Sequence, residues 1–170
     1  YASGTEFFKS TNSGATWVKT TTGLPLATAV QRSALAVSAA TPSTVYMIMA
    51  KVTTYDTEGF YRSTNSGASF VKMSTPNTGT QGFYDLCVAA SPTNASEVML
   101  GGQTQFQKST NNGTAWSMIA GSTHVDYHDI IYTSATTAYL ASDGGIWKTT
   151  DGGTNWTNKS PGLVISQLYG

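Results

Sequence analysis

A short polar stretch occurs four times along the chain and constrains its fold more than any other feature. The copies, which we call boxes, are STNSGATW at 10–17, STNSGASF at 63–70, STNNGTAW at 109–116 and TTDGGTNW at 149–156. Their spacing falls from 53 residues to 46 and then to 40. A repeat of this length with strands between the copies is typical of a four-stranded propeller blade.

Each box is predicted to form the turn of a β-hairpin. Its third residue, Asn or Asp, can accept hydrogen bonds from backbone N–H groups two or three residues further on, and its Ser or Thr hydroxyl can bond locally. Its glycine is free to take a positive φ, and its closing aromatic ring is expected to be buried against the turn, where it holds the two strands together. These structural residues are Ser10, Asn12, Gly14, Trp17, Ser63, Asn65, Gly67, Phe70, Ser109, Asn111, Gly113, Trp116, Thr149, Asp151, Gly153 and Trp156.

Apolar runs between the boxes are predicted to supply the other strands. Each unit holds an inner strand and a second strand: 33–39 with 44–50, 85–91 with 97–102, and 128–134 with 137–142. Near-continuous apolar runs suit strands that neighbouring blades cover on both faces. The predicted fold is therefore an all-β propeller segment of four-stranded antiparallel blades. We place the blades at 1–22 (partial), 30–75, 82–120 and 124–160, with 163–170 starting a next blade or closing the ring.

The full repeat pattern resembles a known family. An aromatic or apolar residue stands two places before Lys or Arg, and [S/T]-T-[N/D]-x-G-x-x-[W/F] follows. This resembles the Asp-box, or BNR repeat, on propellers of sialidases, xyloglucan-cleaving glycosidases and sortilin-like receptors. The final segment, ASDGGIWKTTDGGTNW and onward, is similar to extracellular bacterial multi-blade proteins. The resemblance implies a secreted or cell-surface propeller. We expect a slice of a larger propeller; a four-bladed ring and half of a two-chain ring are the alternatives.

Composition excludes several classes of function. Charged residues make up 11% of the chain, with nine basic and nine acidic side chains, so no cluster of Lys and Arg is available for nucleic acid. No stretch approaches the roughly 20 apolar residues of a membrane span. The single cysteine, Cys87, allows no internal disulfide and is predicted to be buried. No motif calls for a cofactor.

Ligand-binding residues are expected on the rim opposite the boxes. His124, Asp126 and His128 alternate, so they are expected to project to one side of a strand. Two imidazoles and a carboxylate suit a divalent metal or proton transfer. The alternative is a set of hydrogen bonds at a blade junction, and we assign no metal.

Two further segments are candidates on the same rim. Tyr55, Asp56 and Glu58 form a polar, aromatic insertion, in which the ring can contact a sugar and the carboxylates its hydroxyls. The alternative is a solvated loop. Asp143 precedes two glycines, where a simple Asp-Gly turn is the competing interpretation.

The sequence contains no complete set of catalytic residues that we can identify. A glycosidase needs two carboxyl groups about 5–9.5 Å apart, and Asp85, Asp126 and Asp143 are the candidates, although nothing in the sequence pairs them. The sialidase family uses three arginines, whereas this chain has Arg32 and Arg62 only. We therefore expect a non-catalytic scaffold that binds a polysaccharide or protein and pairs with further blades or a second chain. Part of a glycoside hydrolase, xyloglucan-cleaving or sialidase-like, is the alternative, and the enzyme question stays open.

Overall fold

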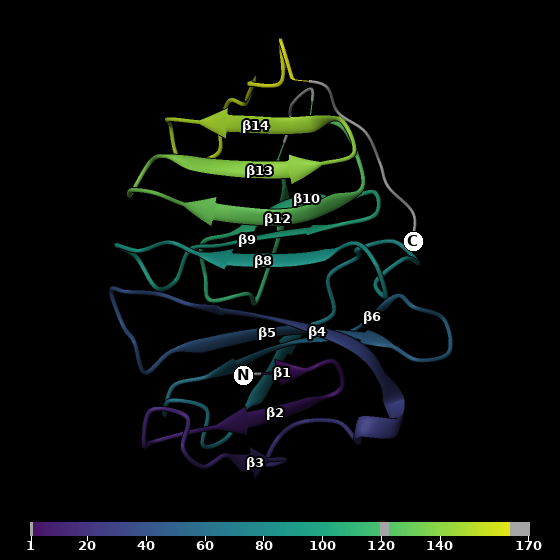
Figure 1. The fold of residues 1–170 in the computed structure, drawn as a ribbon, viewed down its shortest axis with the longest axis vertical. Helices are drawn as coiled ribbons and strands as arrows, with labels where there is room; N and C mark the ends of the chain where they lie inside the picture. The colour runs from purple at the N-terminus through teal and green to yellow at the C-terminus, as the bar shows by residue number, and fades with distance from the viewer. Residues whose placement is uncertain (1, 120–122, 164–170) are drawn as a thin grey trace.

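The computed structural model describes residues 2–119 and 123–163, and its strands form four antiparallel sheets (Figure 1). We call them blades 1 to 4. Blade 1 contains β1 (Ala2–Ser3), β2 (Glu6–Lys9) and β3 (Val18–Thr20), and a 3-10 turn, η1 (Ala27–Ala29), leads to blade 2. Blade 2 contains β4 (Val30–Val37), β5 (Val45–Lys51), β6 (Thr57–Ser63) and β7 (Val71–Ser74). Blade 3 contains β8 (Leu86–Ala90), β9 (Val98–Gly102), β10 (Phe106–Ser109) and β11 (Ser117–Met118). Blade 4 contains β12 (Tyr127–Tyr132), β13 (Ala138–Ser142), β14 (Gly145–Thr149) and β15 (Thr157–Asn158).

The predicted propeller architecture is confirmed. Blades 2, 3 and 4 are four-stranded meanders in which each strand pairs with the next along the chain. The inner strand β8 packs against β4 on one side and against β12 on the other. Figure 1 shows the blades following one another along the longest axis, with blade 1 at one end and blade 4 at the other. The chain is therefore an arc of a propeller. The segment 163–170, which we expected to begin another blade or close the ring, lies almost wholly outside the described residues.

Burial follows the position of each blade in the arc. Every residue of β8 and β9 in blade 3 is buried, because blades 2 and 4 cover both faces. In β13 and β14 of blade 4, buried residues alternate with exposed or half-buried ones, because a described neighbour covers one face only. The hydrophobic core accordingly consists of three clusters, each lying between two successive blades.

The boxes form the turns between third and fourth strands, and a hydroxyl organises each one. In the second box, Ser63 Oγ donates to Asn65 Oδ1 (2.8 Å) and accepts from the backbone N–H of Gly67 (2.9 Å). Asn65 Oδ1 also accepts from the N–H of Ser69 (3.0 Å). In this box the acceptor bonds four residues on, because the Ser63 hydroxyl takes the Gly67 N–H and the Asn65 carbonyl takes the Ala68 N–H (3.3 Å). In the fourth box Asp151 Oδ1 also accepts from the N–H of Thr154, three residues on, as predicted (3.0 Å).

The box aromatic rings lie against their own turns, as predicted, and also against the preceding blade, which was not predicted. A Cβ on Gly14 would lie 3.7 Å from Trp17 Cζ2, and Trp156 Nε1 donates to the Gly153 carbonyl (3.1 Å). Phe70 and Trp156 are 3% and 8% exposed because their rings also contact Phe7 and Phe106 of the preceding blades. Trp17 belongs to blade 1, which has no preceding blade among the described residues, and its ring is 50% exposed. The prediction that Trp17 is buried is therefore wrong.

The lone cysteine is buried, as predicted. Cys87 lies in β8 at 4% exposure, and burial raises the pKa of its thiol to about 12. The thiolate is the nucleophilic form, so this residue is chemically inert at neutral pH. Among the described residues, no helix has the length and apolar character needed to cross a membrane.

Candidate functional site

The rim opposite the boxes is built from loops that are linked along the arc by backbone hydrogen bonds. Gly82 N–H donates to the Tyr55 carbonyl (2.9 Å), which joins the blade 2 to blade 3 connection to the β5–β6 turn. Asp126 N–H donates to the Gln103 carbonyl (2.9 Å), and Asp143 N–H donates to the Asp126 carbonyl (3.2 Å). Loops of three blades thus form one continuous surface, which we call the opposite rim.

A histidine between two carboxyl groups stands on this rim. His128, the second residue of β12, places Nε2 2.6 Å from Asp143 Oδ1 and Nδ1 3.4 Å from Asp85 Oδ1. Asp85 directly precedes β8, and Asp143 lies in the β13–β14 turn. Packing of the inner strands β8 and β12 brings these residues together from two blades.

Asp85 is the buried member of the group. Its side chain is 1% exposed, and the nearest charged partner is His128, whose Nδ1 lies 3.4 Å from Asp85 Oδ1. Burial raises the pKa of this carboxyl to about 6, the His128 imidazole opposes the rise, and the charges of Asp126 and Asp143 add to it. A carboxyl group that exchanges its proton near neutral pH beside an imidazole is suited to proton transfer.

The trio that we predicted on one strand is only partly assembled. β12 begins at Tyr127, and Asp126 has a left-handed φ of 61°, so His124 and Asp126 precede the strand. The predicted projection of all three side chains from one strand face is therefore wrong. His124 packs instead against the β13–β14 turn, where a Cβ on Gly144 would lie 2.2 Å from its own Cβ.

Within residues 2–119 and 123–163, no group of three or more His, Cys, Asp or Glu side chains is arranged to hold a metal ion. The close contact of His128 with Asp143 instead pairs an imidazole directly with a carboxylate.

The predicted insertion, with Tyr55, Asp56 and Glu58, lies partly in a loop of the opposite rim and partly in a strand of the sheet. Tyr55 lies at the tip of the β5–β6 turn with a φ of 58°, and its ring is edge-on to Phe83 with centroids 5.0 Å apart. Asp56 binds the Thr54 hydroxyl and Lys51 Nζ, and these bonds lower its pKa. Asp56 is therefore already engaged by its own loop.

Glu58 is not a loop residue as we expected, because β6 already includes it. Its carboxylate lies 3.3 Å from Lys72 Nζ and accepts a hydrogen bond from the Tyr61 hydroxyl. Burial and this carboxylate raise the Tyr61 pKa. Glu58 therefore stabilises the outer part of blade 2.

Two aromatic residues of the opposite rim escaped the sequence analysis. Phe83 and Tyr84 are 47% and 42% exposed, and the Tyr84 ring is edge-on to His128 at 5.1 Å. The Arg32 guanidinium donates to the Tyr84 carbonyl, which fixes the backbone of this pair. The available signal was an aromatic pair directly before an acidic residue at the start of an apolar strand.

The arrangement limits which carboxyls can act on a glycosidic bond. The His128 ring lies between Asp85 and Asp143, where the bond of a substrate would have to lie. Asp85 is also closed to ligands by burial. Asp126 and Asp143 are the remaining carboxyl groups of the cluster for direct contact with a ligand.

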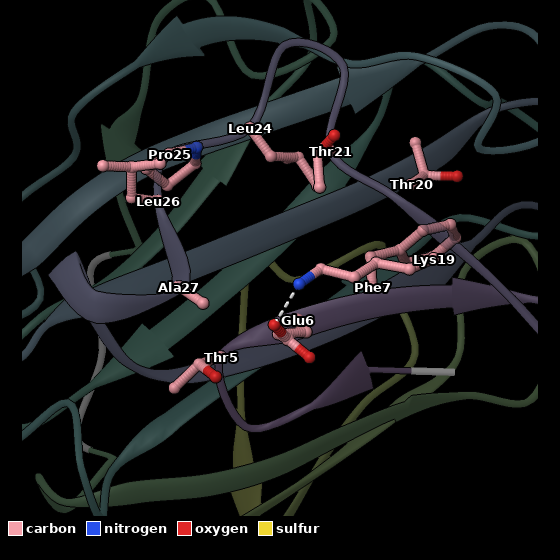
Figure 2. Close-up of a pocket in the computed structure, with 10 residues that line it drawn as sticks. All are labelled: Thr5, Glu6, Phe7, Lys19, Thr20, Thr21, Leu24, Pro25, Leu26 and Ala27. Atoms are coloured by element: carbon pink, nitrogen blue, oxygen red, sulfur yellow. Dashed lines mark hydrogen bonds and ion pairs between the residues drawn. The ribbon is translucent and has the colours of Figure 1, made fainter.

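A separate hollow of about 320 Å³ lies on blade 1 and contains none of these residues (Figure 2). Threonine and aliphatic side chains from 19–27 form much of its wall, and Lys19 forms an ion pair with Glu6 across it. This hollow offers no acidic cluster and no exposed aromatic pair, so the opposite rim remains the candidate site.

Comparison with known proteins identifies the fold of the chain. No family model matches the chain, and no curated protein matches it. Among solved structures, a GH74 enzyme from Niastella koreensis superposes with a TM-score of 0.70 at 20% identity, over 91% of this chain and 26% of that one. An ancestral GH74 enzyme gives 0.60 at 22% identity, over 88% of this chain and 20% of that one.

A third similar structure is YCF48 bound to D1 peptide, with a TM-score of 0.51 at 15% identity, over 73% of this chain and 39% of that one. At these identities the likeness shows the fold alone. The chain spans about a fifth to two fifths of the chains it matches. These comparisons identify the chain as a β-propeller segment.

Proposed function

We propose that the opposite rim binds carbohydrate and that the blades act as its rigid, non-catalytic scaffold. The observation that carries the proposal is the set of half-exposed aromatic rings beside the acidic cluster. Tyr55, Phe83 and Tyr84 are 39%, 47% and 42% exposed, and Tyr84 contacts His128, which binds Asp143.

This combination suits a sugar ligand. Aromatic faces take up the apolar face of a sugar ring, and carboxylates accept hydrogen bonds from its hydroxyl groups. The backbone hydrogen bonds that link the rim loops keep these groups in place, which lowers the entropic cost of binding. We assign the segment to a secreted or cell-surface protein, where polysaccharides are accessible. A protein ligand is the competing class, and the peptide-bound YCF48 structure is the similar protein that supports it.

A second candidate is part of a glycoside hydrolase, and one observation favours it. Asp126 and Asp143 lie close enough to Asp85 for their charges to raise the pKa of its carboxyl group, so several carboxyl groups lie together beside His128 on this rim. Either of these two would need a second carboxyl group across the ligand, which can come from a longer polypeptide.

The binding proposal is tested with isothermal titration calorimetry and affinity electrophoresis on xyloglucan and cellulose oligosaccharides. Phe83→Ala and Tyr84→Ala should each weaken binding by about tenfold, since truncation of an anchoring aromatic costs more than about 1 kcal/mol. Met118→Ala, at a 55% exposed position on β11, is the matched control and should bind normally. Equal binding by all three variants would refute the proposed site.

Turnover separates the two candidates. Release of reducing sugar from the same polysaccharides should be absent in the wild-type chain if the scaffold proposal holds. Measurable release that Asp126→Asn or Asp143→Asn abolishes, with binding retained, would replace the scaffold with the hydrolase.

A further inference from the structure

His128 joins a buried carboxyl group to a more exposed one across the junction of blades 3 and 4. The Asp85 side chain is 1% exposed, and its Oδ1 lies 3.4 Å from His128 Nδ1. The Asp143 side chain is 27% exposed, and its Oδ1 lies 2.6 Å from His128 Nε2. A neutral imidazole carries one hydrogen, on Nδ1 or on Nε2, so it can donate to one of these carboxyl groups at a time.

The protonation state of Asp85 decides which carboxyl group receives that hydrogen. A protonated Asp85 is neutral, so the ring can carry its hydrogen on Nε2 and donate it to the Asp143 carboxylate. An ionised Asp85 is shielded from water, and a buried charge without a donor is costly. Asp143 is partly hydrated, so it loses less when the ring hydrogen moves to Nδ1.

The surrounding groups hold the imidazole ring in one orientation. The Tyr84 ring is edge-on to it, with centroids 5.1 Å apart, and the Arg32 guanidinium donates to the Tyr84 carbonyl. On the other side, the backbone of Asp143 is fixed by its N–H bond to the Asp126 carbonyl (3.2 Å). The hydrogen therefore changes position by proton transfer, and the ring does not need to turn over.

We infer that Asp85 is a positioning residue: it sets the tautomer of His128 and thereby decides whether Asp143 binds the imidazole or a ligand. When Asp85 ionises, its proton passes to Nδ1, the N–H bond at Nε2 breaks, and the Nε2 proton leaves to water while the electron pair stays on the nitrogen. Nε2 and the Asp143 carboxylate are then two acceptors in contact, which repel each other. The carboxylate turns to other donors. In the carbohydrate site proposed above these are sugar hydroxyl groups, so this last step rests on that proposal.

The change runs in one direction with pH. Burial raises the pKa of Asp85 to about 6, so its proton is lost as pH rises from about 5 to about 7. The His128 ring opposes the rise in pKa, and the charges of Asp126 and Asp143 contribute to it. Binding of a ligand that donates hydrogen bonds to Asp143 should therefore tighten over this range.

Other titratable and charged groups surround Asp85, His128 and Asp143. Burial raises the pKa values of Cys87 and Tyr127, so both groups stay neutral between about pH 5 and 8. At the end of β5, the Lys51 ammonium forms an ion pair with Asp56 (3.0 Å). The remaining groups are Arg32 on β4, Tyr84 before β8, His124 and Asp126 before β12, and Asp129 on β12.

Nitrogen-15 NMR of the imidazole groups tests the tautomer without any ligand. At about pH 8, the neutral form of the His128 ring should carry its hydrogen on Nδ1 in the wild type. In Asp85→Asn it should carry the hydrogen on Nε2, because Asp143 is then the carboxylate that faces the ring. Asp143→Asn keeps Asp85 and should keep the hydrogen on Nδ1, which tests the inference even if Asp85→Asn does not fold. His124, the other histidine of the chain, is the internal reference.

A matched control and two contrary results complete the NMR test. Asp129→Asn makes the same change one residue after His128, at a carboxylate that accepts from the Ile130 N–H (2.9 Å), and should keep the wild-type tautomer. The same tautomer in the wild type and in Asp85→Asn would overturn the inference. A wild-type His128 ring that is still doubly protonated at about pH 8 would also overturn it.

Isothermal titration calorimetry at about pH 5 and 8 tests the effect on binding, with xyloglucan and cellulose oligosaccharides as the probes. Wild-type affinity should be about tenfold higher at the upper pH, the effect of one hydrogen bond to a charged group. Asp85→Asn should bind with the lower affinity at both pH values, because Nε2 then carries a hydrogen in both the neutral and the charged ring. Asp129→Asn should behave as the wild type does.

The outcomes separate this inference from the proposed function. Sugar binding whose affinity does not change with pH in the wild type, or changes equally in Asp85→Asn, would overturn the inference and leave the binding site in place. A tautomer that depends on Asp85, with no sugar binding at either pH, would refute the proposed function and support the role of Asp85 in setting the tautomer.

Discussion

Asp85 is a single buried residue whose carboxyl group is protonated more readily in the folded chain than in the unfolded one. The folded chain raises its pKa from 3.8 to about 6 through burial, so folding favours the protonated carboxyl. A raised carboxyl pKa contributes stability below the unfolded value, and that contribution is lost as pH rises through the folded value. The free energy of unfolding of the wild type therefore falls between about pH 4 and 7. A variant with a neutral residue of the same shape at this position does not lose that contribution.

The Asp85→Asn variant should therefore become more stable relative to the wild type as pH rises. The difference in free energy of unfolding between variant and wild type should grow by about 2 to 3 kcal/mol from pH 4 to pH 7, since one pKa unit corresponds to about 1.36 kcal/mol. Urea unfolding at pH 4, 5.5 and 7 measures it. Asp129→Asn, an exposed carboxylate on β12, is the control. A difference that is constant with pH would contradict the assignment of a buried, protonated Asp85.

At the scale of the element, the box is both a turn and a docking surface. Gly14 and Gly113 have nearly the same left-handed φ, 87° and 81°, so alanine strains both backbones equally, by about 1–2 kcal/mol. They differ in their surroundings. A Cβ on Gly113 would lie 2.1 Å from Phe60, whereas a Cβ on Gly14 would meet only Trp17 at 3.7 Å.

Gly113→Ala should consequently destabilise the fold more than Gly14→Ala does. Overpacking at the blade 2 to blade 3 junction should add about 1–3 kcal/mol to the shared strain. Chemical denaturation of both variants measures the difference. Equal losses would mean that the boxes act as turns alone and that the junctions do not depend on glycine.

These junctions also show what the sequence could and could not predict. The repeat spacing and the apolar runs predict the blades, because turn chemistry and strand burial are local properties. The contact of a box ring with the preceding blade was not predicted: Phe70 lies on Phe7, which is 63 residues earlier. His128 likewise meets Asp85 from another blade. Such contacts depend on how loops of different lengths bring successive sheets together. The residue pattern of one sequence does not indicate which side chains of two different blades will meet.

The whole molecule is an arc in which each blade contacts only its neighbours, so its stability should vary along the chain. Stability in such arrays is approximately a sum of unit and nearest-neighbour contributions, and an end unit lacks one neighbour. β8 and β9 are buried on both faces, whereas β13 and β14 are covered on one. The centre of the arc should therefore open less often than its ends.

Hydrogen exchange measures this gradient directly. Amides of β5, β8 and β9 should exchange more slowly than those of β2, β13 and β14. A ratio of more than about tenfold corresponds to about 1.4 kcal/mol of local stability. Uniform protection along the chain would mean that the arc unfolds as one cooperative unit, and that its end faces are as stable as its centre.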